Sequence, residues 1–399
     1  MKNIRPRITE PSRQVPVADR FDVVCVGAGI AGSAAAVAAA RTGARVGLVE
    51  KTCSPGGLAT LANVVYYLPL CDGCGRQVIG GLGEELLKLS IRDGTDEIPE
   101  CWRAGGEPKE RTKKRYRVRF NPACLLLELE QLLVSEGVKI FYDTRFCSVH
   151  RDAGRIDSIV VENKDGRSAL RAGAVVDATG DADACTAAGE PTVSLDTNGA
   201  AAWFFYDQAG EFKLCSCHAA FDAAGGPPPD GDRGFAGDDA RDVTEHVLAS
   251  RRMIRQRLQK MAENSQQSVR PLLVPTMPSF RMTRRLKGEV ELEREDEGNA
   301  FPDVVGLTGD WRAAGPVYHI PLRALVAPQT DNLITAGRCI SSAGAWDVTR
   351  AIPACVVTGQ AAGVASALSV RRGGEGISEM EIGLIQDTLR EQDVMLESD

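Results

Sequence analysis

The stretch VCVGAGIAGSAAAVAAARTGARVGLVEK, residues 24–51, decides the fold. An apolar run over residues 21–26 leads directly into the glycine loop of residues 27–32. An alanine-rich helix is expected over residues 33–41, and a second strand over residues 44–49. Strand, glycine loop, helix and strand in this order form a βαβ unit that binds dinucleotides. The sequence therefore predicts an α/β fold with a Rossmann-like sheet.

Each glycine of the loop has a separate physical role. Gly27 permits the tight turn, Gly29 lets the backbone approach a pyrophosphate at the helix N-terminus, and Gly32 lets helix and strand pack closely. Glu50 ends the second strand, where a carboxylate accepts a hydrogen bond from a ribose hydroxyl and repels a 2′-phosphate. A glycine turn without a nucleotide is the alternative. The expected cofactor contacts here are Gly27, Gly29, Ile30, Ala31, Gly32, Glu50 and Lys51.

Two later segments favour FAD over NAD. A glycine pair follows Glu50 in the segment PGGLAT, residues 55–60, where many flavoproteins bring the chain close to the ribityl and flavin portion. The segment DATGD, residues 177–181, follows an apolar strand, although an ordinary strand-to-loop turn gives the same pattern. The expected cofactor contacts from these segments are Gly56, Gly57, Ala59, Thr60, Ala178, Thr179, Gly180 and Asp181.

A third marker lies near the C-terminus, in residues 330–368. A strand over residues 333–336 precedes Gly337 and Arg338, and a helix begins near Pro353, since proline is tolerated in a first helical turn. Small residues recur at three- and four-residue spacing and make one helix face nearly flat, so we expect it to pack against a sheet or cofactor. These small residues are Gly359, Ala362, Gly363 and Ser366, and the expected cofactor contacts are Gly337, Arg338 and Ile352.

The order of several blocks along residues 21–370 resembles one flavoprotein family. The blocks are GAGIAG, PGGLAT, DATGD, RMTRRLKG, VYHIPLRALVAP, DNLITAGRCIS and TRAIPACVVTGQAAG. They resemble the FAD-dependent oxidoreductases related to the flavin subunit of heterodisulfide reductase, and more distantly the fumarate reductase and thiazole-synthesis flavoproteins. The resemblance implies an enzyme with bound FAD in a two-dinucleotide-binding-domain fold carrying an inserted α+β cap.

Relatives in that family carry iron–sulfur clusters of the 4Fe–4S type, so the cysteines matter. The chain has 12 cysteines but no CxxCxxCxxxC run. Cys71 and Cys74 are the weak candidates for a metal site. They fit half of a cluster, a zinc site with two distant ligands, a redox dithiol, or bystanders in a glycine-rich loop.

The chain divides into five predicted parts. They are a flexible tail over residues 1–20, an FAD-binding domain over 21–200 and 301–372, a cap or substrate domain over 201–300, and a helical tail over 373–399. Within the cap, a strand is expected over residues 201–208 and an amphipathic helix over residues 242–264.

Five residues are candidates for catalysis. Arg281, Arg284 and Arg285 lie within one short span and suit an anionic substrate, because guanidinium groups hold carboxylates with paired hydrogen bonds; a solvated basic face is the alternative. His319 is a candidate for moving a proton, with a buried histidine bonded to backbone as the alternative. Arg350 flanks the turn into the last helix, where it contacts substrate or flavin or caps the helix.

These residues predict an FAD-dependent oxidoreductase that transfers a hydride between a small anionic substrate and flavin N5. Two alternatives are an electron-transfer subunit working with an iron–sulfur or thiol partner, and a dinucleotide-binding module without chemistry. No second GxGxxG motif is present for NAD(P)H, so electrons are expected to come from the substrate or from a protein partner.

Composition limits the partners. The net charge is −7 and no basic stripe is expected, so nucleic acid is not an expected partner. The apolar stretches 34–40 and 361–370 are too short to cross a bilayer, so no membrane contact is expected. Many cysteines without an export signal predict a cytoplasmic protein with free thiols. The sequence leaves the oligomeric state open.

Overall fold

The computed structural model describes residues 8, 12–94, 96–222, 224–229 and 231–397. Half of the predicted N-terminal tail, residues 1–7 and 9–11, lies outside the described residues. Strand β1 begins at Val17, so the prediction of a loose tail up to residue 20 is wrong for its last four residues. Val17 is already paired with Ala169, so the polar residues that follow Val17 belong to the strand.

The strands are β1 (Val17–Val26), β2 (Val46–Val49), β3 (Tyr66–Tyr67), β4 (Val118–Arg119), β5 (Lys139–Phe141), β6 (Arg145–Asp152), β7 (Arg155–Asn163), β8 (Gly166–Asp177), β9 (Thr192–Ser194), β10 (Ala201–Gln208), β11 (Glu211–His218), β12 (Val269–Leu273), β13 (Arg284–Leu286), β14 (Val304–Gly309), β15 (Val317–Pro321) and β16 (Leu333–Thr335). The α-helices are α1 (Ile30–Arg41), α2 (Leu58–Leu61), α3 (Gly81–Ser90), α4 (Pro122–Ser135), α5 (Asp183–Ala188), α6 (Ala240–Ser265), α7 (Trp346–Thr349), α8 (Ile352–Arg371) and α9 (Ile382–Glu391).

One large sheet carries the glycine loop. Its order is β5-β2-β1-β8-β7-β6, and β16 also pairs with β8. Strands β5, β2, β1, β8 and β16 run parallel, whereas β7 and β6 join as antiparallel neighbours. The carboxyl ends of β1, β2, β8 and β16 therefore lie at one edge, where ligands bind in parallel α/β sheets. The predicted α/β class is confirmed.

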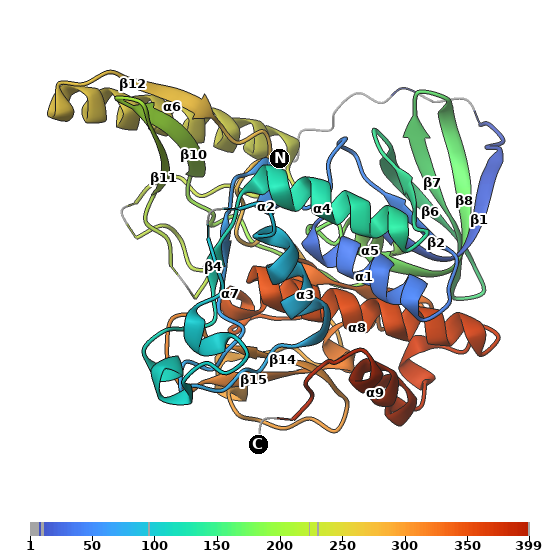
Figure 1. The fold of residues 1–399 in the computed structure, drawn as a ribbon. Coiled ribbons are helices and arrows are strands. Elements are labelled where there is room, and N and C mark those ends of the chain that lie inside the picture. The colour runs from blue at the N-terminus through green and yellow to red at the C-terminus, as the bar shows by residue number, and fades with distance from the viewer. Residues whose placement is uncertain (1–7, 9–11, 95, 223, 230, 398–399) are drawn as a thin grey trace.

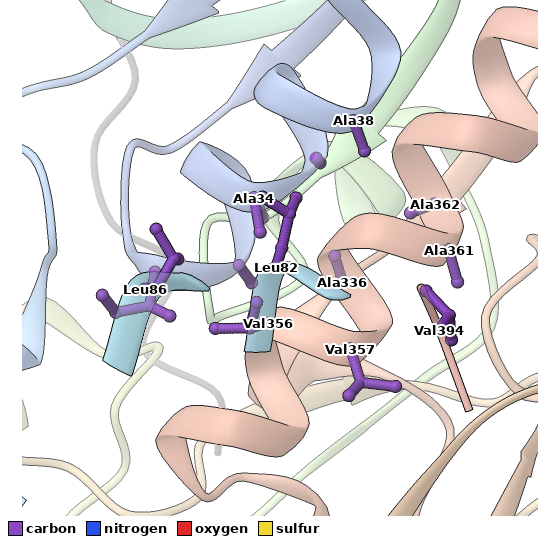
Figure 2. Packing of buried hydrophobic residues seen from close by; sticks show 14 of the residues in the cluster. Ala34, Ala38, Leu82, Leu86, Ala336, Val356, Val357, Ala361, Ala362 and Val394 are labelled. Carbon is purple, nitrogen blue, oxygen red and sulfur yellow. The ribbon is translucent and has the colours of Figure 1, made fainter. Parts of the chain in front are cut away.

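Helices α1 and α8 form the centre of the core (Figure 1). A β-carbon added at Gly359 or Gly363 would lie under 3.0 Å from the backbone of α1, so the two helices touch almost backbone to backbone. Figure 2 shows the alanine-rich surroundings of this contact, with Ala34 on α1 and Ala361 on α8. The predicted flat face of the last helix exists, but it packs on α1, and the expectation of a sheet or cofactor as its neighbour is corrected.

Helix α8 is longer than the apolar stretch predicted over residues 361–370. It spans 20 residues, from Ile352 to Arg371, and is long and apolar enough to cross a membrane by those two measures alone. However, 89% of its most apolar window is buried inside the protein, as in the core helix of a soluble protein. Burial inside the protein is sufficient to explain why the helix is so apolar.

The cap projects from this body (Figure 1). It consists of the antiparallel sheet β11-β10-β12 with α6 packed on one face through Phe204, Ile254 and their neighbours. The expectation that the chain has no basic stripe is wrong, because α6 carries five basic residues and no acid between His246 and Ala262. The net charge of the whole chain does not reveal this concentration, because acidic residues elsewhere outnumber the basic ones.

Candidate active site at the edge of the parallel sheet

The glycine loop has the close approaches that its spacing predicts. Gly27 adopts φ +97°, and a β-carbon there would lie 2.6 Å from the carbonyl oxygen of Ala178. A β-carbon on Gly32 would collide with the carbonyl oxygen of Gly27. Both positions therefore require glycine for packing alone, whether or not a ligand is bound.

Gly29 differs from its two neighbours in the motif. No heavy atom lies within 4 Å of the position that its β-carbon would take, so the backbone there faces open space. Gly29 is also the N-cap of α1, and no side chain caps that end of the helix. The first N–H groups of a 12-residue helix thus point into an open cradle, which fits the pyrophosphate of FAD.

Glu50 lies beside this cradle and is 5% exposed. One carboxylate oxygen accepts a hydrogen bond from the backbone N–H of Ala28 at 2.8 Å, and the other accepts from the backbone N–H and hydroxyl of Thr52. Each carboxylate oxygen has two lone pairs, so capacity remains for a ribose hydroxyl. Lys51, in contrast, is exposed.

The distant segments predicted to contact the cofactor meet around the glycine loop. Gly56 donates its N–H to the carbonyl oxygen of Ala28 at 2.8 Å, and a β-carbon on Gly57 would lie 3.1 Å from the α-carbon of Gly29. Ala178 packs on Gly27, and a β-carbon on Gly337 would lie 2.9 Å from the β-carbon of Ala31. The turn after Ala178 continues through Thr179, Gly180 and Asp181. Helix α2 contains Ala59 and Thr60, and α8 begins at Ile352. Their contact with FAD stays a prediction.

Arg338 holds this edge of the sheet together. Its side chain donates hydrogen bonds to the carbonyl oxygens of Gly180 and Phe280, at 2.7 and 2.8 Å, and to the carboxylate of Asp181 at 2.6 Å. These three bonds tie the DATGD turn to the segment that leaves the cap. The predicted contact between Arg338 and the cofactor would therefore use the Arg338 backbone or the guanidinium N–H groups that these three bonds leave over.

A shallow hollow lies beside this edge, where the segment after β9, the cap and α7 meet. Its lining is Leu195, Thr197, Asn198, Gly199, Phe221, Asp222, Gly225, Arg281, Met282 and Trp346. Asn198 accepts hydrogen bonds from the backbone N–H groups of Arg281 and Met282, and so fixes the segment that carries Arg281 along the wall.

Arg281 is the exceptional cation of the hollow. Its guanidinium group stacks on the ring of Phe221, 3.9 Å from the centroid, and has no hydrogen bond or ion pair with any side chain in the described residues. Burial lowers the pKa of Arg281 to about 10, and repulsion from Arg350 adds to this effect. Asp347 offsets part of this repulsion, but no carboxylate forms an ion pair with Arg281 among the described residues, so the half-buried cation favours an anionic ligand.

Two further unpaired donors lie at or next to this wall. The indole N–H of Trp346, which lines the hollow, and the Nε of Arg350, which does not, are buried and have no hydrogen-bond partner among the described residues. Arg350 lies over the Trp346 ring, 5.0 Å from its centroid, and forms an ion pair with Asp347. Asp347 is shared with Arg312 at 2.9 Å, so Arg350 is only partly neutralised.

The other two arginines of the predicted block face elsewhere. Arg284 pairs with Asp183 at 2.6 Å and donates to the carbonyl oxygen of Asp181 at 2.9 Å. Arg285 is buried and forms an ion pair with Glu291. The structure therefore divides the block into one open cation, Arg281, and two arginines that already have carboxylate partners.

His319 lies in the β14–β15 hairpin and is 7% exposed. Burial lowers its pKa, which keeps the imidazole neutral and able to accept a proton. It is not in the lining of the hollow that contains Arg281. Its predicted role in proton transfer stays a prediction.

The cysteines give no metal centre in the described part of the chain, where no group of three or more His, Cys, Asp and Glu side chains is arranged to hold a metal ion. Cys71 is buried and Cys74 is exposed. Burial raises the pKa of the Cys71 thiol, which disfavours the thiolate that metals and redox reactions require.

The parallel sheet, the glycine cradle and the capped hollow define a flavoprotein of the dinucleotide-binding class. The sequence model described as FAD dependent oxidoreductase matches residues 22–202 and 210–389, so the chain belongs to this family. It is therefore an oxidoreductase, and FAD is its cofactor.

Individual proteins are similar over different lengths. A stretch of 81 residues, 20% of this chain, is 38% identical to thioredoxin reductase of Ureaplasma parvum serovar 3 and spans 26% of that protein, about a quarter of its length. A geranylgeranyl bacteriochlorophyll reductase-like protein of Thermoplasma acidophilum has a TM-score of 0.48 and 11% identity over 94% of this chain and 84% of that chain. A chain of the Mycobacterium smegmatis Sdh1 complex has a TM-score of 0.47 and 16% identity over 93% of this chain and 72% of that chain.

Of the ten residues that line the hollow, only Arg281 was predicted from the sequence; Asn198, Phe221 and Trp346 are among those that were not. Trp346 stood within one helical turn of Arg350, a spacing that places both side chains on one side of a helix. No local pattern distinguishes Asn198 or Phe221, because both reach the hollow through the folding of the cap onto the sheet.

Proposed function

We propose that this oxidoreductase acts on a small substrate bearing a carboxylate, which Arg281 and Arg350 bind at the hollow beside the sheet edge. FAD supplies hydride exchange at its N5 atom, a reaction that belongs to the cofactor. The protein supplies the position and the charge.

The single observation that carries the proposal is the set of unpaired donors on Arg281 and Trp346, which line the hollow, and on Arg350, which stacks on Trp346. Arg281 has no ion-pair partner in the described residues, and the Trp346 N–H and the Arg350 Nε are buried without an acceptor. Buried donors without acceptors cost free energy, about 1–3 kcal/mol each. A carboxylate offers acceptors to all three groups and neutralises the charge at once.

His319 is proposed to move the proton that accompanies hydride transfer. Its neutral imidazole is the form that accepts a proton, and its pKa is lowered by burial. His319→Gln is expected to lower the rate of turnover without weakening carboxylate binding, because position 319 is absent from the hollow lining. A loss of binding equal to the loss of rate would argue against this division of roles.

Calorimetric titration of the FAD-loaded protein with succinate and with benzoate tests the binding site. Arg281→Gln is expected to weaken the tighter-binding carboxylate by about 10-fold or more, since a hydrogen bond to a charged group contributes roughly 1.5–3 kcal/mol. Arg284→Gln is the matched control, because Arg284 already has Asp183 as its partner. Equal weakening by both variants, or equal binding of succinamide, would refute the proposal.

Within the family, we infer that the chain belongs with the oxidoreductases related to the flavin subunit of heterodisulfide reductase. The support is the set of sequence blocks from GAGIAG to TRAIPACVVTGQAAG in that order. An absorption spectrum of the purified protein with an iron assay on the same sample tests the related alternative of an electron-transfer subunit. Flavin bands with stoichiometric iron would favour that alternative, and flavin without iron would favour the dehydrogenase or reductase. We further propose a cytoplasmic location, on the number of cysteines that the structure leaves unpaired.

A further inference from the structure

The outer face of α6 carries an unusual concentration of positive charge. Its exposed basic residues are Arg251, Arg252, Arg255, Arg257 and Lys260. None of them forms an ion pair with another described residue. The chain as a whole has a net charge of −7, so this face is positive on an acidic protein. Arg251, Arg252 and Arg255 lie on one side of the helix, whereas Arg257 and Lys260 are turned away from that side. We name Arg251, Arg252 and Arg255 the basic face of α6.

An apolar side chain lies at the N-terminal end of the basic face. Leu248 is 50% exposed and lies three, four and seven positions before Arg251, Arg252 and Arg255, which places it beside them on the same side of the helix. An exposed leucine next to three arginines has the composition of a protein–protein interface, where apolar residues and arginine are found together. A phosphate backbone gains nothing from such a leucine.

The opposite face of α6 is unavailable to a bilayer. Ile254, Leu258 and Met261 pack against the cap sheet through Phe204 and Tyr206. A helix that lies in a membrane surface inserts its apolar face among the lipids, and α6 has already buried that face in its own domain. The exposed side therefore favours a protein with an acidic surface.

The redox chemistry of the family requires a second electron donor or acceptor besides the substrate, and a carrier protein is one such partner. The structure describes one parallel sheet, and its other described sheets are antiparallel, with two or three strands each. The described residues therefore contain no second dinucleotide-binding sheet for NAD(P)H. The electrons of the second half-reaction then pass to a small oxidant or to a protein.

The basic face borders the candidate active site. Arg251 and Ser279 line a second, shallow hollow together with His246. Two residues beyond Ser279, Arg281 lines the hollow proposed to bind substrate. His246 also stacks on Phe280, with ring centroids 4.2 Å apart, so α6 is coupled directly to the segment between the two hollows.

We propose that the basic face of α6, together with the adjacent Leu248, docks an acidic electron-carrier protein. The proposal rests on the proposed function, because it supplies the partner of the second half-reaction. Oxidation of one substrate molecule releases two electrons and two protons. A one-electron carrier therefore docks twice per turnover and leaves with one electron each time, while the protons pass to water. In the opposite direction the same carrier delivers the electrons.

The test uses the full FAD-loaded chain and two defined acidic carriers, a plant-type [2Fe–2S] ferredoxin and a flavodoxin. The variant Arg251→Glu/Arg252→Glu/Arg255→Glu is compared with Lys109→Glu/Lys114→Glu/Arg117→Glu, which makes the same charge change on exposed residues elsewhere. Binding is measured by biolayer interferometry at low and moderate salt. Reoxidation of the photoreduced protein is followed by stopped-flow absorbance, and thermal unfolding checks that both variants fold.

We expect salt-sensitive binding to at least one carrier, because steering between opposite charges weakens with ionic strength. The α6 variant should bind about 10-fold or more weakly and transfer electrons correspondingly slowly at subsaturating carrier, while the control variant stays within about twofold of the parent. Reoxidation by the small dye dichlorophenolindophenol should be the same in all three proteins.

Three results would overturn the proposal. They are no salt-sensitive binding to either carrier, equal weakening by both triple variants, and α6-dependent binding to anionic phospholipid vesicles or duplex DNA without binding to a carrier. A failure of the proposed function looks different, since a protein that takes up no FAD or cannot be photoreduced fails before any carrier is added.

Discussion

Gly359 of α8 lies so close to Ala31 of α1 that a β-carbon at position 359 would approach the carbonyl oxygen of Ala31 to under 3.0 Å. Gly363 has the same relationship with Ala35, one helical turn further along. The contact holds the N-terminal half of α8 against the helix whose first turn forms the glycine cradle. The geometry of the cofactor site thus depends on two glycines that are not themselves predicted to contact the cofactor.

Alanine at either glycine should destabilise the fold. The added methyl group has no space, so the helices must separate or shift, and overpacking of this kind typically costs about 1–3 kcal/mol. We expect Gly359→Ala and Gly363→Ala each to lower the free energy of unfolding by at least that amount in urea titrations. A variant with unchanged stability would show that the helices part without cost.

Ser366 on the same helix gives the opposite prediction. Its hydroxyl is buried and has no hydrogen-bond partner among the described residues. Removing an unsatisfied buried hydroxyl relieves a desolvation penalty of roughly 1–3 kcal/mol, part of which the lost packing offsets. We expect Ser366→Ala to be neutral or stabilising in the same titrations, and a clear destabilisation would reveal a partner for the hydroxyl.

Two glycines of the loop should separate cofactor binding from stability. Gly29→Ala adds a methyl group where no atom lies within 4 Å, so the apoprotein should keep its melting temperature. The same methyl group occupies the cradle in which a pyrophosphate is expected, and the dissociation constant for FAD should rise at least tenfold. Gly32→Ala should instead lower the melting temperature of the apoprotein, because the methyl group meets the carbonyl oxygen of Gly27. Fluorescence titration and calorimetry measure both quantities. Equal effects of the two variants would contradict the assignment.

Glu50 should contribute to FAD binding through its charge. Glu50→Ala removes an acceptor that holds the Ala28 N–H and is expected to face a ribose hydroxyl. A hydrogen bond to a charged group contributes about 1.5–3 kcal/mol, so we expect FAD affinity to fall roughly 10- to 100-fold, and less in Glu50→Gln. Glu107→Ala, at an exposed position, is the control and should bind FAD as the parent does.

The sequence could predict the βαβ unit, the strand before Gly337 and the start of α8, because each has a local signature in glycine, proline or apolar spacing. It could not predict that α1 covers the flat face of α8, since that contact joins residues from opposite ends of the chain. It also could not separate Arg281 from Arg284 and Arg285. Their directions depend on the pairing of β13 with β9, which places Arg284 opposite Ser194.

His246 should make stability depend on pH. It is fully buried, and burial lowers its pKa from the ordinary value of 6.5 to about 4. Between these two values the unfolded chain binds a proton that the folded protein does not, so the free energy of unfolding falls as the pH falls. The loss reaches about 3 kcal/mol at pH 4, from 1.36 kcal/mol for each pKa unit.

Phenylalanine at position 246 removes this titration and keeps an aromatic ring against Phe280. Between pH 7 and pH 4, the free energy of unfolding should therefore fall by about 3 kcal/mol less in His246→Phe than in the parent. Urea unfolding at a series of pH values measures the difference. His150→Phe, at an exposed position, should follow the parent, and parallel curves for all three proteins would contradict the prediction.

Strand β16 completes the parallel sheet by pairing with β8, although the whole cap lies between them in the chain. On the ribosome, the nucleotide-binding lobe therefore waits for its last strand and for α8 until the cap has been synthesised. Until then the alanine-rich face of α1 has no cover. Nascent chains of this protein should thus need protection by chaperones late in synthesis. Chains whose synthesis is arrested before residue 371 should be sensitive to protease, whereas chains arrested after the whole sequence has been synthesised should not.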